Sequence, residues 1–170
     1  PTGKLDATCQ EVSSGWGPAG TTRVAVETVA SGLDVPWGLA FLPGGRLLVT
    51  ERPGRLRLIE SGALVAAPLA EVSALVRGES GLLGVTADPQ VETNRRIYLY
   101  VTADSPSGPV NRVERWTVSL DFRSATKDKE LVTGIPGAQF HDGGRLRFGP
   151  DGMLYVGTGD ARSPDRAQAA

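Results

Sequence analysis

The chain has 170 residues, with 18 Lys and Arg against 19 Asp and Glu, a single His and a net charge of −1. This near-neutral balance gives no electrostatic reason to expect a nucleic acid or an anionic membrane as partner, and no apolar run approaches the roughly 20 residues that span a bilayer as a helix. The 22 Gly and 12 Pro are typical of many short strands joined by tight turns.

Residues 1–22 contain several Gly and Ser and show no periodicity, so we expect a flexible lead-in there and one domain over 23–170. Cys9, the only cysteine, is either a lipid-anchor or disulfide residue or an unpaired thiol. Removal of a signal peptide would leave a chain that, like this one, does not begin with Met. We therefore expect a secreted or periplasmic protein, with lipid anchoring as one option.

One pattern occurs three times along the chain, at 39–50, 83–102 and 146–158. Each copy has a short apolar run, a turn containing Pro, and a second run rich in β-branched and aromatic residues. Proline presets φ and glycine accepts a positive φ, so each copy predicts two antiparallel strands joined by a turn.

The segments between these hairpins also predict strands. In chain order they are 23–30, 54–59, 64–69, 112–118 and 130–135, and 69–76 is the only candidate helix. Four strands per unit are typical of propeller blades. We predict an all-β fold, a β-propeller of four-stranded antiparallel blades. The chain would cover about two and a half of them: a closing strand at 23–30, two blades and the inner hairpin of a third.

A closed propeller needs roughly four to eight blades. We therefore expect the remaining blades to come from sequence outside this chain or from another chain, because an open fan would expose strand edges and apolar faces to water.

His141 is the only histidine and precedes the predicted inner strand of the third hairpin, at a rim where loops of several blades converge. An imidazole can accept a proton near neutral pH. Asp160 follows the second strand of the same hairpin, so the two side chains should be neighbours, and a carboxylate there would fix the tautomer of the ring. The alternatives are a histidine that fills a polar loop and an aspartate that caps a turn.

Residues 141–160, HDGGRLRFGPDGMLYVGTGD, resemble the active-site hairpin of the soluble dehydrogenases of glucose and aldose sugars that depend on pyrroloquinoline quinone (PQQ). The broader group includes sorbosone dehydrogenase-like proteins. Residues 35–43, VPWGLAFLP, and 78–84, GESGLLG, agree with this resemblance. It extends from about 23 to 160 and corresponds to the N-terminal half of a six-bladed propeller.

By this resemblance, His141 is the catalytic base that takes the hydroxyl proton of an aldose or related sugar while a hydride passes to PQQ, and Asp160 orients that base. Glu79 and His141 would contact the cofactor. Glu79 stands where the family often has glutamine, and a carboxylate cannot donate a hydrogen bond unless it is protonated.

The resemblance also implies calcium and an external electron acceptor. The family's Arg, Lys and calcium ligands lie mainly in later blades, so we predict no metal site in this chain and no sugar oxidation by the 170-residue chain alone.

Other residues near these motifs are expected to be structural. We expect Trp37 and Phe41 to pack between blades, Arg145 to bond loop carbonyls beneath the site, and Asp142 to be a solvated loop acid. Two other functions stay open for the fold: a non-catalytic propeller that binds a protein, and a metal-dependent hydrolase of the lactonase type, whose acidic and asparagine ligands are not evident.

Overall fold

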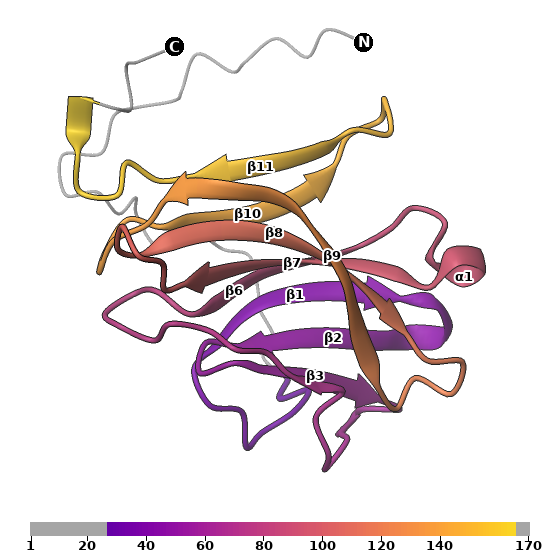
Figure 1. Ribbon diagram of the computed structural model, residues 1–170. Coiled ribbons are helices and arrows are strands. Elements are labelled where there is room, and N and C mark those ends of the chain that lie inside the picture. The colour runs from indigo at the N-terminus through magenta and orange to yellow at the C-terminus, as the bar shows by residue number, and fades with distance from the viewer. Residues whose placement is uncertain (1–26, 166–170) are drawn as a thin grey trace, which may run out of the picture.

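The computed structural model describes residues 27–165, which form three antiparallel sheets (Figure 1). The first sheet contains β1 (Pro36–Leu42), β2 (Arg46–Glu51) and β3 (Arg55–Glu60), and two short strands, β4 (Ala63–Leu64) and β5 (Ala70–Glu71), both pair with β3. The second sheet contains β6 (Leu82–Ala87), β7 (Arg96–Ala103), β8 (Val110–Val118) and β9 (Ala125–Pro136). The third is the hairpin of β10 (Gly143–Phe148) and β11 (Leu154–Thr158).

Two short helical turns, η1 (Pro43–Gly45) and α1 (Val91–Asn94), connect the first two strands of the first and second sheets. No helix in residues 27–165 is long and apolar enough to cross a membrane.

The three sheets lie in chain order, with the second between the other two (Figure 1). Their first strands are neighbours, because β6 contacts both β1 and β10. Glycine permits this close approach, since a Cβ on Gly84 would collide with the main-chain carbonyl of Gly144. Adjacent blades of a propeller, with β1, β6 and β10 as inner strands, have this arrangement.

The main apolar core lies between the first and second sheets. It is formed mainly by Leu48, Leu56, Leu58, Leu82, Ile97, Leu99 and Val101, each fully buried. A smaller cluster of Leu83, Tyr100 and Val113 contacts the third sheet, and Trp37 packs against it as expected. Phe41 does not pack between the described blades. It is 76% exposed, because alternation along β1 turns it to the opposite face from the buried Ala40 and Leu42.

The predicted outer strand 64–69 is largely wrong. Of residues 64–69 only Leu64 is in a strand, as the last residue of β4, and β5 begins at Ala70. The guanidinium of Arg57 binds the carbonyls of Val65 and Ala66, at 3.1 and 3.3 Å, while the N–H groups of Val65 and Leu69 donate to carbonyls of β3. Pro68 has no N–H to donate. The predicted outer strand 130–135 of the second sheet is confirmed within the longer β9.

Two further expectations differ from the structure. Residues 69–76 form no helix, because the N–H groups of Val72 and Leu75 donate to the carbonyls of Gly54 and Thr102 on other segments. Of the predicted closing strand 23–30, residues 23–26 lie outside the described residues, and 27–30 are not in a strand.

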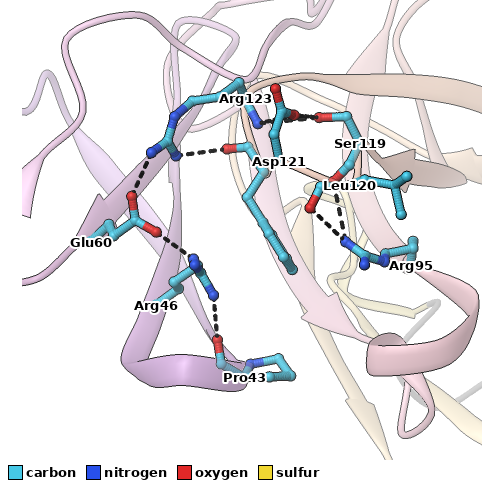
Figure 2. Close-up of polar contacts among 9 residues, drawn as sticks. Pro43, Arg46, Glu60, Arg95, Ser119, Leu120, Asp121 and Arg123 are labelled. Carbon is cyan, nitrogen blue, oxygen red and sulfur yellow. Dashed lines mark hydrogen bonds and ion pairs between the residues drawn. The ribbon is translucent and has the colours of Figure 1, made fainter.

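A polar cluster joins the first two sheets through Glu60, Arg46 and the loop between β8 and β9 (Figure 2). Glu60, at the end of β3, accepts bonds from Arg46 Nε at 2.5 Å and Arg123 Nη2 at 2.6 Å. The ring of Phe122, in the loop between β8 and β9, lies between the guanidinium groups of Arg46 and Arg95, at 4.6 and 5.0 Å from its centroid. This loop therefore braces the second blade against the first.

Candidate active site

His141 lies in the loop before β10, in a left-handed backbone conformation with φ of 65°. Its carbonyl accepts the N–H of Ala161 at 3.1 Å. A Cβ on Gly159 would collide with that carbonyl. The segment after β11 can therefore lie directly against the segment before β10 because residue 159 is glycine.

The side chains of His141 and Asp160 are in contact, as the hairpin geometry predicted. The distance from Nδ1 to Oδ1 is 2.9 Å, and the histidine side chain is 59% exposed against 22% for the aspartate. Pairing of Gly143 with Thr158 at this end of β10 and β11 brings the two segments together.

The electrostatics of this pair favour an ionised Asp160. Its pKa lies below the ordinary value, chiefly because the His141 ring hydrogen-bonds to it and also because the N–H of Arg162 donates to Oδ1 at 2.9 Å. A charged acceptor at Nδ1 places the ring proton on Nδ1 and leaves Nε2 as the lone-pair nitrogen. No described residue hydrogen-bonds to Nε2, so this nitrogen can meet a ligand.

Glu79 adjoins the pair, and its carboxylate binds the backbone of the base. Its Oε2 accepts the main-chain N–H of His141 at 2.9 Å, and its own N–H donates to the carbonyl of Gln139 at 2.8 Å. Arg52, which sequence reasoning missed, donates from Nη1 to the carbonyls of Gly78 and Ser80 on either side of Glu79. Glu79 thus helps to hold His141, whereas contact with a cofactor stays a prediction.

Asp142 is not a solvated loop acid, which corrects the prediction from the sequence. It is 2% exposed, and its Oδ1 accepts from Asn111 Nδ2 and from the N–H of Ala138, both at 3.0 Å. Sequence reasoning also missed Asn111 as a contributor to the site. Its signal was a polar side chain directly before the alternating strand 112–118. An amide that is buried there requires hydrogen-bond partners.

Among residues 27–165, Arg145 bonds to no loop carbonyl, contrary to the expectation. Its guanidinium lies over the ring of Trp37, 4.3 Å from the centroid. The contact is a cation–π pair that connects the first and third sheets near the starts of β1 and β10.

The residues present fit the substrate side of a quinone and sugar site. An exposed imidazole with an ionised partner can take a proton from a hydroxyl, and the nearby Glu79 is a hydrogen-bond acceptor. Within residues 27–165, no three His, Cys, Asp or Glu side chains gather in a way that could hold a metal ion.

A hollow of about 680 Å³ in the described part of the chain lies elsewhere, between residues 41–43 and 87–93. Its acids include Asp88, which accepts the Tyr98 hydroxyl at 2.7 Å, and burial together with this bond raises the pKa of Tyr98 to about 12. The Tyr98 hydroxyl therefore stays protonated near neutral pH and occupies one oxygen of the Asp88 carboxylate.

The family model described as Glucose / Sorbosone dehydrogenase matches residues 33–170. The chain belongs to this family. The resemblance noted in the sequence is therefore confirmed.

Individual relatives agree with this assignment. The chain is 35% identical over 160 residues to the aldose sugar dehydrogenase YliI of Escherichia coli, with 88% of this chain and 42% of the relative covered. The structure of the PQQ-bound form of aldose sugar dehydrogenase from Streptomyces coelicolor superimposes with a TM-score of 0.76 at 36% identity, covering 84% of this chain and 43% of that one. The chain is also 30% identical over 156 residues to the human Hedgehog-interacting protein, with 79% of this chain and 22% of that protein covered.

The chain thus spans less than half the length of these relatives. The predicted fold class is confirmed: an all-β propeller, of which this family member contributes two blades and the inner hairpin of a third.

Proposed function

We propose that this family member, completed by its remaining blades, oxidises an aldose or related sugar with PQQ as cofactor, and that His141 is the catalytic base. The observation that carries the proposal is the 2.9 Å contact between His141 Nδ1 and Asp160 Oδ1, made by an imidazole that is otherwise exposed. The PQQ named with the Streptomyces coelicolor structure supports the choice of cofactor.

The roles of the chain's own residues follow from this contact. With Nδ1–H donated to Asp160, Nε2 is the atom that accepts the proton of the sugar hydroxyl. The ionised Asp160 then stabilises the imidazolium. PQQ, when bound, supplies the acceptor for the hydride that leaves the carbon bearing this hydroxyl.

Glu79 and His141 would contact PQQ from this side. The cationic and calcium ligands would come from the blades that this chain lacks, and an external acceptor would reoxidise the cofactor. The secreted or periplasmic location stays a prediction.

Replacement of His141 tests the proposal in the full-length protein supplied with PQQ and calcium and assayed on a panel of sugars. Loss of a general base typically lowers turnover by about 10²–10⁴-fold, so we expect His141→Ala to lose at least about 100-fold in kcat while its circular dichroism spectrum stays native. Asp128→Asn, on the exposed face of β9, is the control and should keep normal turnover. Normal rates in His141→Ala would refute the assignment of the base.

A non-catalytic propeller that binds a protein is the second candidate, favoured by the similarity to the human Hedgehog-interacting protein. The same assay separates the two, because a binding module would turn over no sugar on the panel even with His141 intact.

A further inference from the structure

A buried acid follows the proposed base directly in the chain. Asp142 is 2% exposed, and its carboxylate receives hydrogen bonds from an amide side chain and a main-chain N–H, without an ion pair to any Lys or Arg of residues 27–165. Its Oδ2 has no hydrogen-bond partner among the described residues. Burial of a carboxylate without a cation is costly, so a residue that served only to fill this space would be better replaced by an apolar one.

The side-chain partners of Asp142 come from the two middle strands of the second blade. Asn111 on β8 is fully buried and donates from Nδ2 to Asp142 Oδ1 at 3.0 Å and to the carbonyl of Pro136 at 2.9 Å. Tyr100 on β7 donates its hydroxyl to the Asp142 carbonyl at 2.8 Å. Burial, together with the negative charge of Asp142, raises the pKa of Tyr100, so the hydroxyl remains a donor.

The same chain of bonds reaches the loop that carries Glu79. Asn111 Oδ1 accepts the hydroxyl of Thr102 at 2.7 Å, and Thr102 Oγ1 accepts the N–H of Gly81 at 3.3 Å. Glu79, two residues earlier, binds the N–H of His141 at 2.9 Å. Hydrogen bonds therefore connect the loop of His141 and the loop of Glu79 in two ways. One connection is direct, between Glu79 and His141, and the other runs from Asp142 through two side chains of the second blade to Gly81.

We propose that Asp142 and Asn111 are positioning residues for His141, which fix the backbone of the base and its distance to the Glu79 loop. This inference rests on the proposed function, because it assigns a role in placing the base of that reaction. His141 needs such support, since its φ of 65° is unfavourable for a residue other than glycine.

The test uses the full-length protein with PQQ and calcium and compares Asp142→Ala with Glu114→Ala. Glu114 is a matched control: it is a fully buried acid on the same strand as Asn111, but it binds Arg112, Lys127 and Trp116. A base displaced by about 1 Å can lose roughly 100-fold in rate. Asp142→Ala removes the acceptor of both bonds, so we expect it to lower kcat by about 10- to 100-fold with little change in KM, and to shift the pH profile of kcat. Glu114→Ala should lower thermal stability without lowering kcat.

A conservative exchange and a smaller deletion sharpen the test. Asp142→Asn keeps an oxygen that can accept both bonds at the Oδ1 position, so we expect it to retain most of kcat. Thr102→Val, which removes only the hydroxyl that bonds to Asn111, should lower kcat by less than Asp142→Ala, and serves where Asp142→Ala does not fold.

Normal kcat in folded Asp142→Ala, or a loss in Asp142→Asn as large as that in Asp142→Ala, would overturn the positioning role. If His141→Ala is inactive while Asp142→Ala is fully active, only this inference fails. If His141→Ala is fully active, the proposed function fails as well.

Discussion

At the scale of single residues, His141 combines an exposed ring with a tightly held backbone. Its N–H binds the Glu79 carboxylate, its carbonyl binds Ala161, and its ring binds Asp160. A left-handed backbone in a residue other than glycine costs on the order of 1–3 kcal/mol, and these bonds offset that cost. The imidazole is thus held in place while Nε2 remains open to solvent.

The acid dependence of the pair gives a prediction at this scale. The folded pKa of Asp160 is lowered, so its contribution to stability is fully present above the ordinary aspartate pKa of about 3.9 and is lost as pH falls through the lower folded value. Asp160→Asn lacks this titration. We expect the variant to lose less stability than the wild type on acidification below about pH 4, measured by urea unfolding against pH.

The same variant should lower kcat near neutral pH by at least about 100-fold, since removal of the orienting acid of a comparable His–Asp pair costs roughly 10⁴-fold. If Asp160→Asn had the same kcat as the wild type and lost as much stability on acidification, the carboxylate would neither orient the ring nor have its pKa lowered by the contact.

At the scale of elements, the site and the inter-blade brace lie at opposite ends of the strands. The loops before β6 and β10 carry Glu79 and His141, whereas the loop between β8 and β9 carries Phe122 and Arg123. Stability and activity should therefore respond separately to substitutions at the two ends.

Phe122→Ala tests this separation. The variant loses two cation–π contacts, each contributing about 0.5–1 kcal/mol at exposed sites, so we expect the free energy of unfolding to fall by about 1–2 kcal/mol while kcat/KM is unchanged. Phe122→Leu keeps apolar packing and should lose less. Leu120→Ala, at a side chain that is 80% exposed in the same loop, should lose nothing. A loss in Phe122→Ala no larger than that in Leu120→Ala would show that the ring does not brace the blades.

At the scale of the whole molecule, the two outer sheets expose apolar side chains. Leu39 and Phe41 on the first sheet are 51% and 76% exposed, and Met153 and Tyr155 beside or on β11 are 63% and 56% exposed. In relatives more than twice as long, further chain is available to cover such faces.

We expect the isolated 170-residue chain to self-associate and to bind a hydrophobic dye, and to oxidise no sugar with PQQ and calcium. The full-length protein should be monodisperse and dye-free in the same light-scattering and fluorescence measurements. Replacing Leu39 and Phe41 together by Thr, which suits a strand, should reduce dye binding by the isolated chain, whereas Leu120→Thr in a loop should reduce it less. A monomeric isolated chain that binds no dye, or one that turns over sugar, would contradict this expectation.

Much of the architecture could be predicted because its signals are local. Alternating residues and Pro and Gly turns indicated the three hairpins and β8, and the position of His141 and Asp160 at the two ends of one hairpin was enough to expect their contact. A hairpin returns the chain to the same rim whatever else packs around it.

The sequence by itself thus determined the three hairpins, the third strand of each of the first two sheets and the histidine–aspartate pair. Only the tertiary structure decided that 69–76 is not helical and that Asp142 is buried, because the partners of both lie far away in the chain, at Gly54, Thr102 and Asn111. Periodicity reports which way a side chain points relative to its neighbours, but burial and hydrogen-bond partners depend on which distant strand lies against it.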